Sequence, residues 1–219
     1  LRLPHGAPLW NVKSMNHQSQ RWFEYMSFEY PYLYVAVAEG NVRAINKTGD
    51  EIYKTATFRN AFPGCMAVTQ NFLLTGFKDD FSNDRFLVAN HISGGGFIYS
   101  KFMTGVVAGI VATGGDEAIV FSNNDAGGEI SFYNGQDNSL ALIHPFAEGN
   151  FTKVLKMDDN NLIVSATTGL YRYQISNNSL TTFVSASKAA PFAVDDINRL
   201  VYVCNGKTLE TYSFPFTNL

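Results

Sequence analysis

Four carboxylates lie in segments where the acid–base pair of a glycoside hydrolase would be expected. They are Glu24, Glu29, Asp116 and Glu148. Such enzymes need two carboxyl groups roughly 5–9.5 Å apart, one to protonate the leaving oxygen and one to act as nucleophile or base. Two further acidic pairs, at 158–159 and 195–196, are expected in tight turns, where a carboxylate caps backbone N–H groups. A carbohydrate-active protein, either a lectin or a hydrolase, is therefore one function that the residue types leave open.

Five basic residues offer a different chemistry, the attraction of an anion. One lies in each joint that leads into an expected inner strand: Arg21, Arg59, Lys101, Lys153 and Lys188. In a ring-shaped fold such joints gather at one face, around the mouth of a central channel. A cationic ring there would attract a small anionic ligand or an acidic partner. The competing interpretation is ordinary rim charge, because several of the 16 Lys and Arg residues must fall in five joints by chance.

Metal-binding and nucleophile motifs are missing from the sequence. The histidines, which show no metal-ligand spacing, are His5, His17, His91 and His144. The loop Lys78–Asp84 holds three acids and an Asn but lacks the Gly-punctuated spacing of a calcium loop, so we expect a solvated loop. We expect neither a resident metal nor a cofactor.

The composition shows what kind of fold must position these side chains. Of 219 residues 46% are hydrophobic, so the chain can bury a core. A net charge of −3 without a like-charge block argues against a nucleic-acid surface. The longest apolar runs, Tyr32–Ala38 and Val106–Ala112, are far shorter than the roughly 20 residues that a membrane-spanning helix needs. The 18 Phe and 11 Tyr residues favour strands.

Short apolar runs recur along the chain with a period of about 42 residues. Most are followed by a hairpin turn rich in Gly and Asn, which tolerate the positive φ that tight turns need. The five runs are Leu33–Val37, Phe72–Leu74, Ala118–Phe121, Leu162–Val164 and Leu200–Cys204. Their partner strands begin near Val42, Phe86, Ile130, Leu170 and Leu209.

A strand precedes each of these pairs, and in four cases another strand follows. Preceding strands are expected at Phe23–Phe28, Cys65–Thr69, Val106–Val111, Lys153–Lys156 and Phe192–Val194. Following strands are expected at Glu51–Phe58, Phe97–Met103, Ala141–Phe146 and Ser179–Val184. A four-stranded antiparallel unit repeated roughly every 40 to 45 residues is the signature of a β-propeller blade. We therefore predict an all-β fold, a five-bladed β-propeller in one domain spanning residues 1–219.

The two ends of the chain together can supply all four strands of the fifth blade. The fifth blade lacks a fourth strand near the C-terminus, whereas an isolated strand-like segment, Leu9–Met15, precedes the first blade. Its alternation places Trp10 and Val12 on one side. We predict that this segment is the outer strand of the last blade, so that the N-terminus closes the ring and removes its open edge. The alternatives are another all-β fold or a part of a larger propeller.

The predicted topology determines whether the two cysteines can form a disulfide. Cys65 is expected on the inner strand of the second blade and Cys204 on the second strand of the fifth. These blades are not neighbours in a ring of five, and a disulfide needs Cα atoms within about 7 Å of each other. We predict that both thiols are free and buried.

The segment Asp158–Tyr173, in the fourth blade, carries a family resemblance. It reads Asp-Asp-Asn-Asn-Leu-Ile-Val-Ser-Ala-Thr-Thr-Gly-Leu-Tyr-Arg-Tyr. This segment resembles the repeat of two-component-regulator sensor propellers, Asp-x-Gly-Asn-Leu-Trp-Ile-Gly-Thr followed by Gly-Leu-Tyr-Arg-Tyr. It departs from that pattern at five positions, where Asn160 replaces the first Gly, Ile163 the Trp, Val164 the Ile, Ser165 the second Gly and Ala166 the Thr. The resemblance implies a propeller fold and an exported bacterial setting, periplasmic or extracellular, and it carries over no site residue.

Together these patterns predict a binding module rather than an enzyme. We expect its partner to be an unidentified protein or a small anionic or carbohydrate ligand, with no nucleic acid and no membrane span. The carbohydrate-active protein, with its site at the channel mouth, stays the alternative. Two carboxylates converging at the mouth would favour a hydrolase, whereas an apolar channel and rim would favour a partner-binding scaffold.

Overall fold

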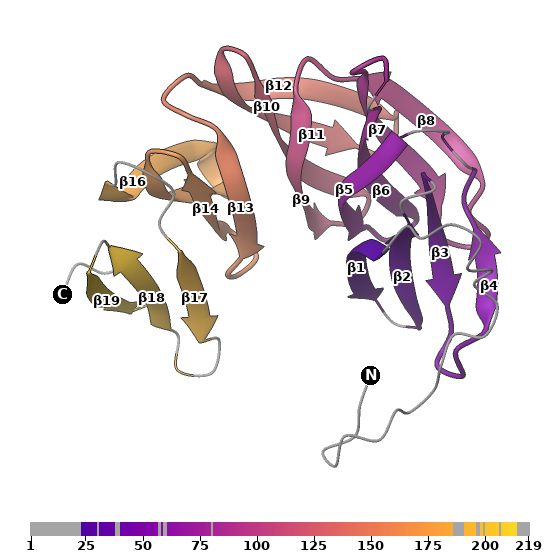
Figure 1. Ribbon diagram of the computed structural model, residues 1–219, viewed down its shortest axis with the longest axis horizontal. Coiled ribbons are helices and arrows are strands. Elements are labelled where there is room, and N and C mark those ends of the chain that lie inside the picture. The colour runs from indigo at the N-terminus through magenta and orange to yellow at the C-terminus, as the bar shows by residue number, and fades with distance from the viewer. Residues whose placement is uncertain are drawn as a thin grey trace.

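The computed structural model of the chain describes residues 23–29, 31–37, 40–56, 58, 61–79, 81–185, 191–195, 198, 200–205 and 207–213. These residues form five antiparallel sheets, which we number 1 to 5 in chain order. Figure 1 shows the sheets arranged side by side along an arc. Within the described ranges no helix is long and apolar enough to cross a membrane.

Each sheet is a meander in which consecutive strands pair. Sheet 1 contains β1 (Phe23–Glu29), β2 (Tyr32–Val37), β3 (Asn41–Ile45) and β4 (Glu51–Lys54). Sheet 2 contains β5 (Ala61–Val68), β6 (Phe72–Asp79), β7 (Arg85–His91) and β8 (Phe97–Phe102). Sheet 3 contains β9 (Val106–Gly114), β10 (Glu117–Asn124), β11 (Gly127–Asn134) and β12 (Ser139–Phe146).

Sheets 4 and 5 continue the same order. Sheet 4 contains β13 (Phe151–Lys156), β14 (Asn161–Ala166), β15 (Gly169–Gln174) and β16 (Ser179–Ser185), with the short 3-10 helix η1 (Ile175–Asn177) before β16. Sheet 5 contains β17 (Phe192–Asp195), β18 (Leu200–Asn205) and β19 (Thr208–Ser213). The five predicted repeats are confirmed, and every strand predicted within them overlaps an observed one.

The turn from the third to the fourth strand is built alike in sheets 3 and 4. The Tyr133 hydroxyl donates to Oδ1 of Asn138 over 3.0 Å, and the Tyr173 hydroxyl donates to Oδ1 of Asn178 over 2.9 Å. Both asparagines adopt a positive φ, 54° and 53°, which Asn tolerates better than most residues. Because the repeat is built from such local contacts, its period is readable from the sequence.

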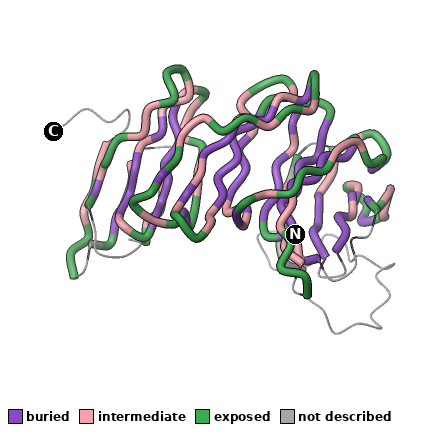
Figure 2. Tube along the Cα trace, turned by 90° about the horizontal axis from the view of Figure 1, so that it is seen from above, coloured by how far each residue is buried: buried purple, intermediate pink, exposed green. Residues whose placement is uncertain are grey.

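Apolar side chains fill the interfaces between successive sheets. Four clusters join sheet 1 to 2, 2 to 3, 3 to 4 and 4 to 5. Leu74 and Val120 belong to the cluster at the second of these interfaces, and Phe121 and Leu162 belong to the cluster at the third. Burying one such side chain contributes about 1.5–3 kcal/mol relative to leaving it exposed. Figure 2 shows the result, with buried strand centres and exposed turns at the strand ends.

The predicted closure of the ring is not found in the described part of the chain. Sheet 5 has three strands, and in the described part of the chain no hydrogen-bonded pairing or core cluster joins it to sheet 1. Figure 1 shows these two sheets on opposite sides of an opening. The predicted closing strand, Leu9–Met15, lies outside the described residues. The rotation between neighbouring sheets depends on the side chains packed between them, which strand alternation does not encode.

Both cysteines are free, as predicted, but only one is buried. Cys65 is 4% exposed, and its thiol donates to the carbonyl of Val107 over 3.6 Å. Cys204 is exposed, which corrects the prediction. Alternation along β18 turns Val203 toward sheet 4 and Cys204 toward the opposite face, which no described sheet covers. The error therefore follows from the predicted ring closure.

The predicted turn role of the paired acids is confirmed for Asp158 and Asp195. Oδ1 of Asp158 accepts hydrogen bonds from the backbone N–H groups of Asn160 and Asn161, over 2.8 and 2.7 Å. Oδ1 of Asp195 accepts one from the N–H of Asn198 over 3.0 Å. These carboxylates fix the turns between the first and second strands of sheets 4 and 5.

Candidate functional site

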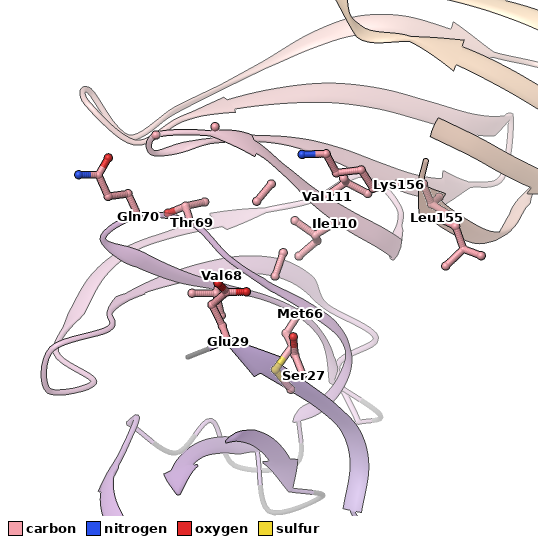
Figure 3. Close-up of a pocket in the computed structure, with 15 residues that line it drawn as sticks. Ser27, Glu29, Met66, Val68, Thr69, Gln70, Ile110, Val111, Leu155 and Lys156 are labelled. Carbon is pink, nitrogen blue, oxygen red and sulfur yellow. The ribbon is translucent and has the colours of Figure 1, made fainter. Parts of the chain in front are cut away.

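The first strands of sheets 1 to 4 line one open cavity of about 570 Å³ (Figure 3). β1, β5, β9 and β13 all contribute to it, and β9 lies against both β5 and β13. We call this cavity the inner groove. Its volume lies within the range of roughly 300–1,000 Å³ that is common for ligand sites.

Apolar side chains form the walls of the inner groove. They come from β5, β9 and β13, the first strands of three consecutive sheets, and they include Met66, Val68, Ile110, Val111 and Leu155. Met66 and Val111 are buried, whereas Val68 and Leu155 are half-buried. The same strands that pack the sheets together therefore also line the cavity with apolar side chains.

Opposite charges lie on the first and the last strand of the groove. Glu29 ends β1 and Lys156 ends β13, and both side chains are exposed and line the cavity. Nζ of Lys156 also lies 3.1 Å from Oδ1 of Asp159, a side chain that is 99% exposed. An exposed ion pair of this kind contributes only about 0–1 kcal/mol, so the Lys156 ammonium can exchange Asp159 for a ligand carboxylate.

A second depression, of about 330 Å³, continues the inner groove over the adjoining turns of sheets 2 and 3. The two cavities share Gln70, Gly114 and Gly115. The second one adds polar and acidic side chains, namely Asp116, Glu117 and Gln136. The groove thus becomes more polar and more acidic toward this end.

Asp116 holds this end of the groove in place. Its Oδ1 accepts hydrogen bonds from the Thr69 hydroxyl over 3.1 Å and from the Asn71 backbone N–H over 2.7 Å. Its Oδ2 accepts one from the Asn71 side-chain amide over 2.8 Å. Asp116 belongs to sheet 3 and its donors to sheet 2, so the carboxylate fixes the two turns to each other.

The glycines beside Asp116 give the turn a backbone conformation that other residues rarely adopt. Gly114 and Gly115 have φ angles of 146° and 52°, and nothing lies within 4 Å of a Cβ placed on either. The requirement for glycine is therefore conformational and not a matter of space. The Gly115 carbonyl accepts a hydrogen bond from the Gln70 backbone N–H over 2.8 Å, which holds Gln70 at the lip of the groove.

The structure describes two of the five basic residues in the predicted cationic ring. Lys153 lies on the inner strand β13, with Nζ 5.0 Å from the ring centroid of Phe192. Lys101 lies on β8, the outermost strand of sheet 2, and its Nζ donates to the carbonyl of Leu140 on β12 over 2.9 Å. The other three, which lie outside the described residues, are Arg21, Arg59 and Lys188. The binding of an anion by this set stays a prediction.

The candidate carboxylates do not meet in the described part of the chain. Glu29 lines the inner groove, Asp116 lines the second depression with both oxygens engaged, and Glu148 is exposed between β12 and β13. The side chain of Glu24 is outside the description. Across the described ranges, no three or more His, Cys, Asp or Glu side chains form a group that could hold a metal ion.

Lys156 and the apolar walls of the groove were not predicted from the sequence. Val68, Ile110 and Leu155 have the composition of any buried strand, so their types alone carry no functional signal. The position of these residues in the repeat could have indicated the groove. Strands that come first in each repeat share the centre of a ring-like fold, and residues at their ends had to converge there.

Several solved structures are similar in architecture to this chain. The chain is similar to the computationally designed protein Ika8, with a TM-score of 0.71 and 13% identity over 96% of this chain and 63% of that chain. It is similar to the β-propeller domain of Cps50 (Swd1) from Myceliophteria thermophila, with a TM-score of 0.66 and 11% identity over 88% of this chain and 65% of that one. The fold is that of a β-propeller.

A third similar structure is a chain of a mitotic checkpoint complex, with a TM-score of 0.68 and 12% identity over 89% of this chain and 61% of that one. The chain therefore spans between 61% and 65% of the length of these three structures. No model of a known protein family matches the sequence, and no curated protein is significantly similar to it. None of these structures is described as a two-component-regulator sensor, so that resemblance stays a prediction.

Proposed function

We propose that this chain is a protein-interaction module whose inner groove binds an extended segment of a partner protein. The observation that carries the proposal is the groove itself, with apolar walls between Glu29 and Lys156. An extended segment presents alternating side chains, so it can fill the apolar walls and place a cation near Glu29 and an anion near Lys156. Charge complementarity of this kind orients a partner and selects against wrong ones.

A binding role suits the described residues better than hydrolysis. Glu29 is the carboxylate that lines the inner groove in the described part of the chain, and it has no acidic neighbour among the lining residues. Asp116 accepts three hydrogen bonds from sheet 2. An acid whose oxygens are already engaged is poorly placed to protonate a leaving group.

The test uses peptides selected on the native protein from a random displayed library. Their affinities are then measured for Glu29→Lys, for Lys156→Glu and for the matched control Lys47→Glu, which reverses an exposed charge in the turn before β4. Each groove reversal should weaken binding at least tenfold, and the control should not. The exchange variant carrying both reversals should prefer peptides with the opposite charge order. Affinities that survive both single reversals would contradict the proposal.

The carbohydrate-active alternative rests on the sequence alone, as does an exported setting. A glycan screen by thermal shift separates it from peptide binding, because a ligand at 100 times its dissociation constant adds about 2.7 kcal/mol of stability. A glycan whose stabilisation is lost in Glu29→Lys but kept in Lys47→Glu would favour a lectin at the same groove.

A further inference from the structure

The last sheet of the arc has one covered face and one open face. Val201 and Val203 of β18 are fully buried against sheet 4. The alternate residues of β18 point the other way, and Leu209 joins them because it pairs with Cys204 across the hairpin. We call this open surface the terminal face. It consists of Leu200, Tyr202, Cys204 and Leu209.

The sequence of β18 is that of a strand covered on both sides. Leu200–Cys204 is an uninterrupted apolar run, which is typical of strands buried on both faces. The equivalent strand of sheet 4, β14, lies between two sheets, and all six of its residues are buried. On the terminal face, in contrast, Leu200 and Tyr202 are half-buried, Cys204 is exposed and Leu209 is 67% exposed. The terminal face therefore has the composition of an interface without a described occupant.

We propose that the terminal face is a docking surface for a further antiparallel β-sheet, covalently continuous with the arc and packed as the five sheets pack on one another. The terminal face continues a series of four established interfaces between sheets. Each of them joins an apolar sheet face to the next sheet in chain order. The terminal face is the surface at which a fifth such interface would begin.

A second copy of this chain fits the terminal face less well. The strands of sheet 5 have four, six and six residues and cover roughly 250 Å² per side at ordinary strand spacing, whereas a stable association between separate chains buries about 800 Å² per partner. A head-to-tail pair would also need a free outer face on sheet 1. There Val35, Val37 and Ile45, which alternate with the residues that face sheet 2, are only 2%, 6% and 1% exposed.

A further sheet would also change the inner groove. Its first strand would lie beside β17, as β9 lies beside β5 and β13. The open side of the arc in Figure 1 would narrow, and the groove would gain another wall. Docking at the terminal face thus bears on the proposed binding site without being required for it.

The test is an extended chain that carries a second copy of residues 151–185, the sheet 4 unit, after residue 219. In sheet 4, Val164 and Tyr171 belong to the apolar face that packs on sheet 3, so the copy would present that face to the terminal face. Docking should slow the labelling of Cys204 by a thiol reagent at least tenfold and raise the urea midpoint. The matched control carries Val164→Glu and Tyr171→Glu in the copy only, and its Cys204 should react at the rate of the unextended chain.

A second extended chain carries residues 61–102 of sheet 2 in place of the copy of sheet 4. It keeps the test decisive if the copy of sheet 4 fails to fold. Unchanged Cys204 labelling in both extended chains would overturn the proposal. Light scattering on the unextended chain supplies the other decisive outcome. A stable dimer in which Cys204 is protected would assign the terminal face to a second copy and would equally overturn the proposal.

Discussion

Asn71 and Asp116 join sheets 2 and 3 through two hydrogen bonds, from the Asn71 backbone N–H over 2.7 Å and from its side-chain amide over 2.8 Å. The two residues belong to corresponding turns in neighbouring repeats. β5 and β9 end at these two turns. The contact between the turns therefore sets the spacing of β5 and β9 where they line the inner groove. The groove at this end is therefore shaped by a polar contact as well as by apolar packing.

Replacing Asp116 tests the contribution of this contact. Asp116→Ala removes the acceptor of three hydrogen bonds that are partly exposed to water, so we expect a loss of about 1–2 kcal/mol in the free energy of unfolding. The control is Asp125→Ala, at an exposed position of the β10–β11 turn, which should change stability by less than about 0.5 kcal/mol. Urea denaturation measures both. Equal stabilities of the two variants would show that Asp116 does not hold the sheets together.

The interface between sheets 3 and 4 offers a test of the apolar packing. Leu162 is fully buried there, and Leu162→Ala should cost about 2–5 kcal/mol because it leaves a cavity. Leu142 lies on the outermost strand of sheet 3 and is 58% exposed, so Leu142→Ala should stay within about 0.5 kcal/mol of the native protein. Thermal and urea unfolding compare the pair. A similar loss in both would contradict the assigned interface.

The two thiols should react very differently. Burial raises the pKa of the Cys65 thiol to about 12, although a hydrogen bond from the backbone of Gly76 opposes this. The folded protein should therefore incorporate one equivalent of iodoacetamide at mildly alkaline pH, at Cys204, and a second equivalent only in denaturant. Peptide mass spectrometry locates each label. Labelling of Cys65 at the rate of Cys204 without denaturant would be incompatible with the buried position.

Buried tyrosines should make the fold sensitive to alkali. Desolvation raises the pKa of Tyr133 and of Tyr173 to about 12, from an ordinary value of 10.0. A raised pKa in the folded state means that the neutral phenol is favoured there. Its contribution to stability is complete below about pH 10 and is lost as the pH rises toward 12. Ultraviolet titration should show a late phenolate class that appears together with unfolding, and Tyr133→Phe should reduce its amplitude.

Much of the fold was predictable because it is local. Hairpin turns such as Tyr133–Asn138 and alternation along strands such as Leu33–Val37 specify a four-stranded unit wherever they occur. The spacing at which these turns and strands recur therefore predicted the five sheets and nearly all strand positions. The capping role of Asp158 and Asp195 followed from the same local chemistry.

What could not be predicted depends on how the repeats pack. The curvature of the arc comes from the volumes of side chains such as Phe121 and Leu162 between sheets, and no one-dimensional pattern reports it. The expected burial of Cys204 was wrong for this reason, and no hydrogen-bonded closure of the ring is found in the described part of the chain. The inner groove was hard to find on similar grounds, because Val68 and Leu155 look like core residues until the strands that carry them are seen to converge.

The openness of the arc underlies both the inner groove and the terminal face, and a distance between sheets 1 and 5 tests it most directly. Met26, exposed on β1, is replaced by Cys, and spin labels on this residue and on Cys204 are measured by pulsed electron resonance. Face-to-face sheets lie about 10 Å apart. We expect a distribution centred well beyond this spacing, whereas a narrow distribution near it would show a closed ring of five and contradict the open arc.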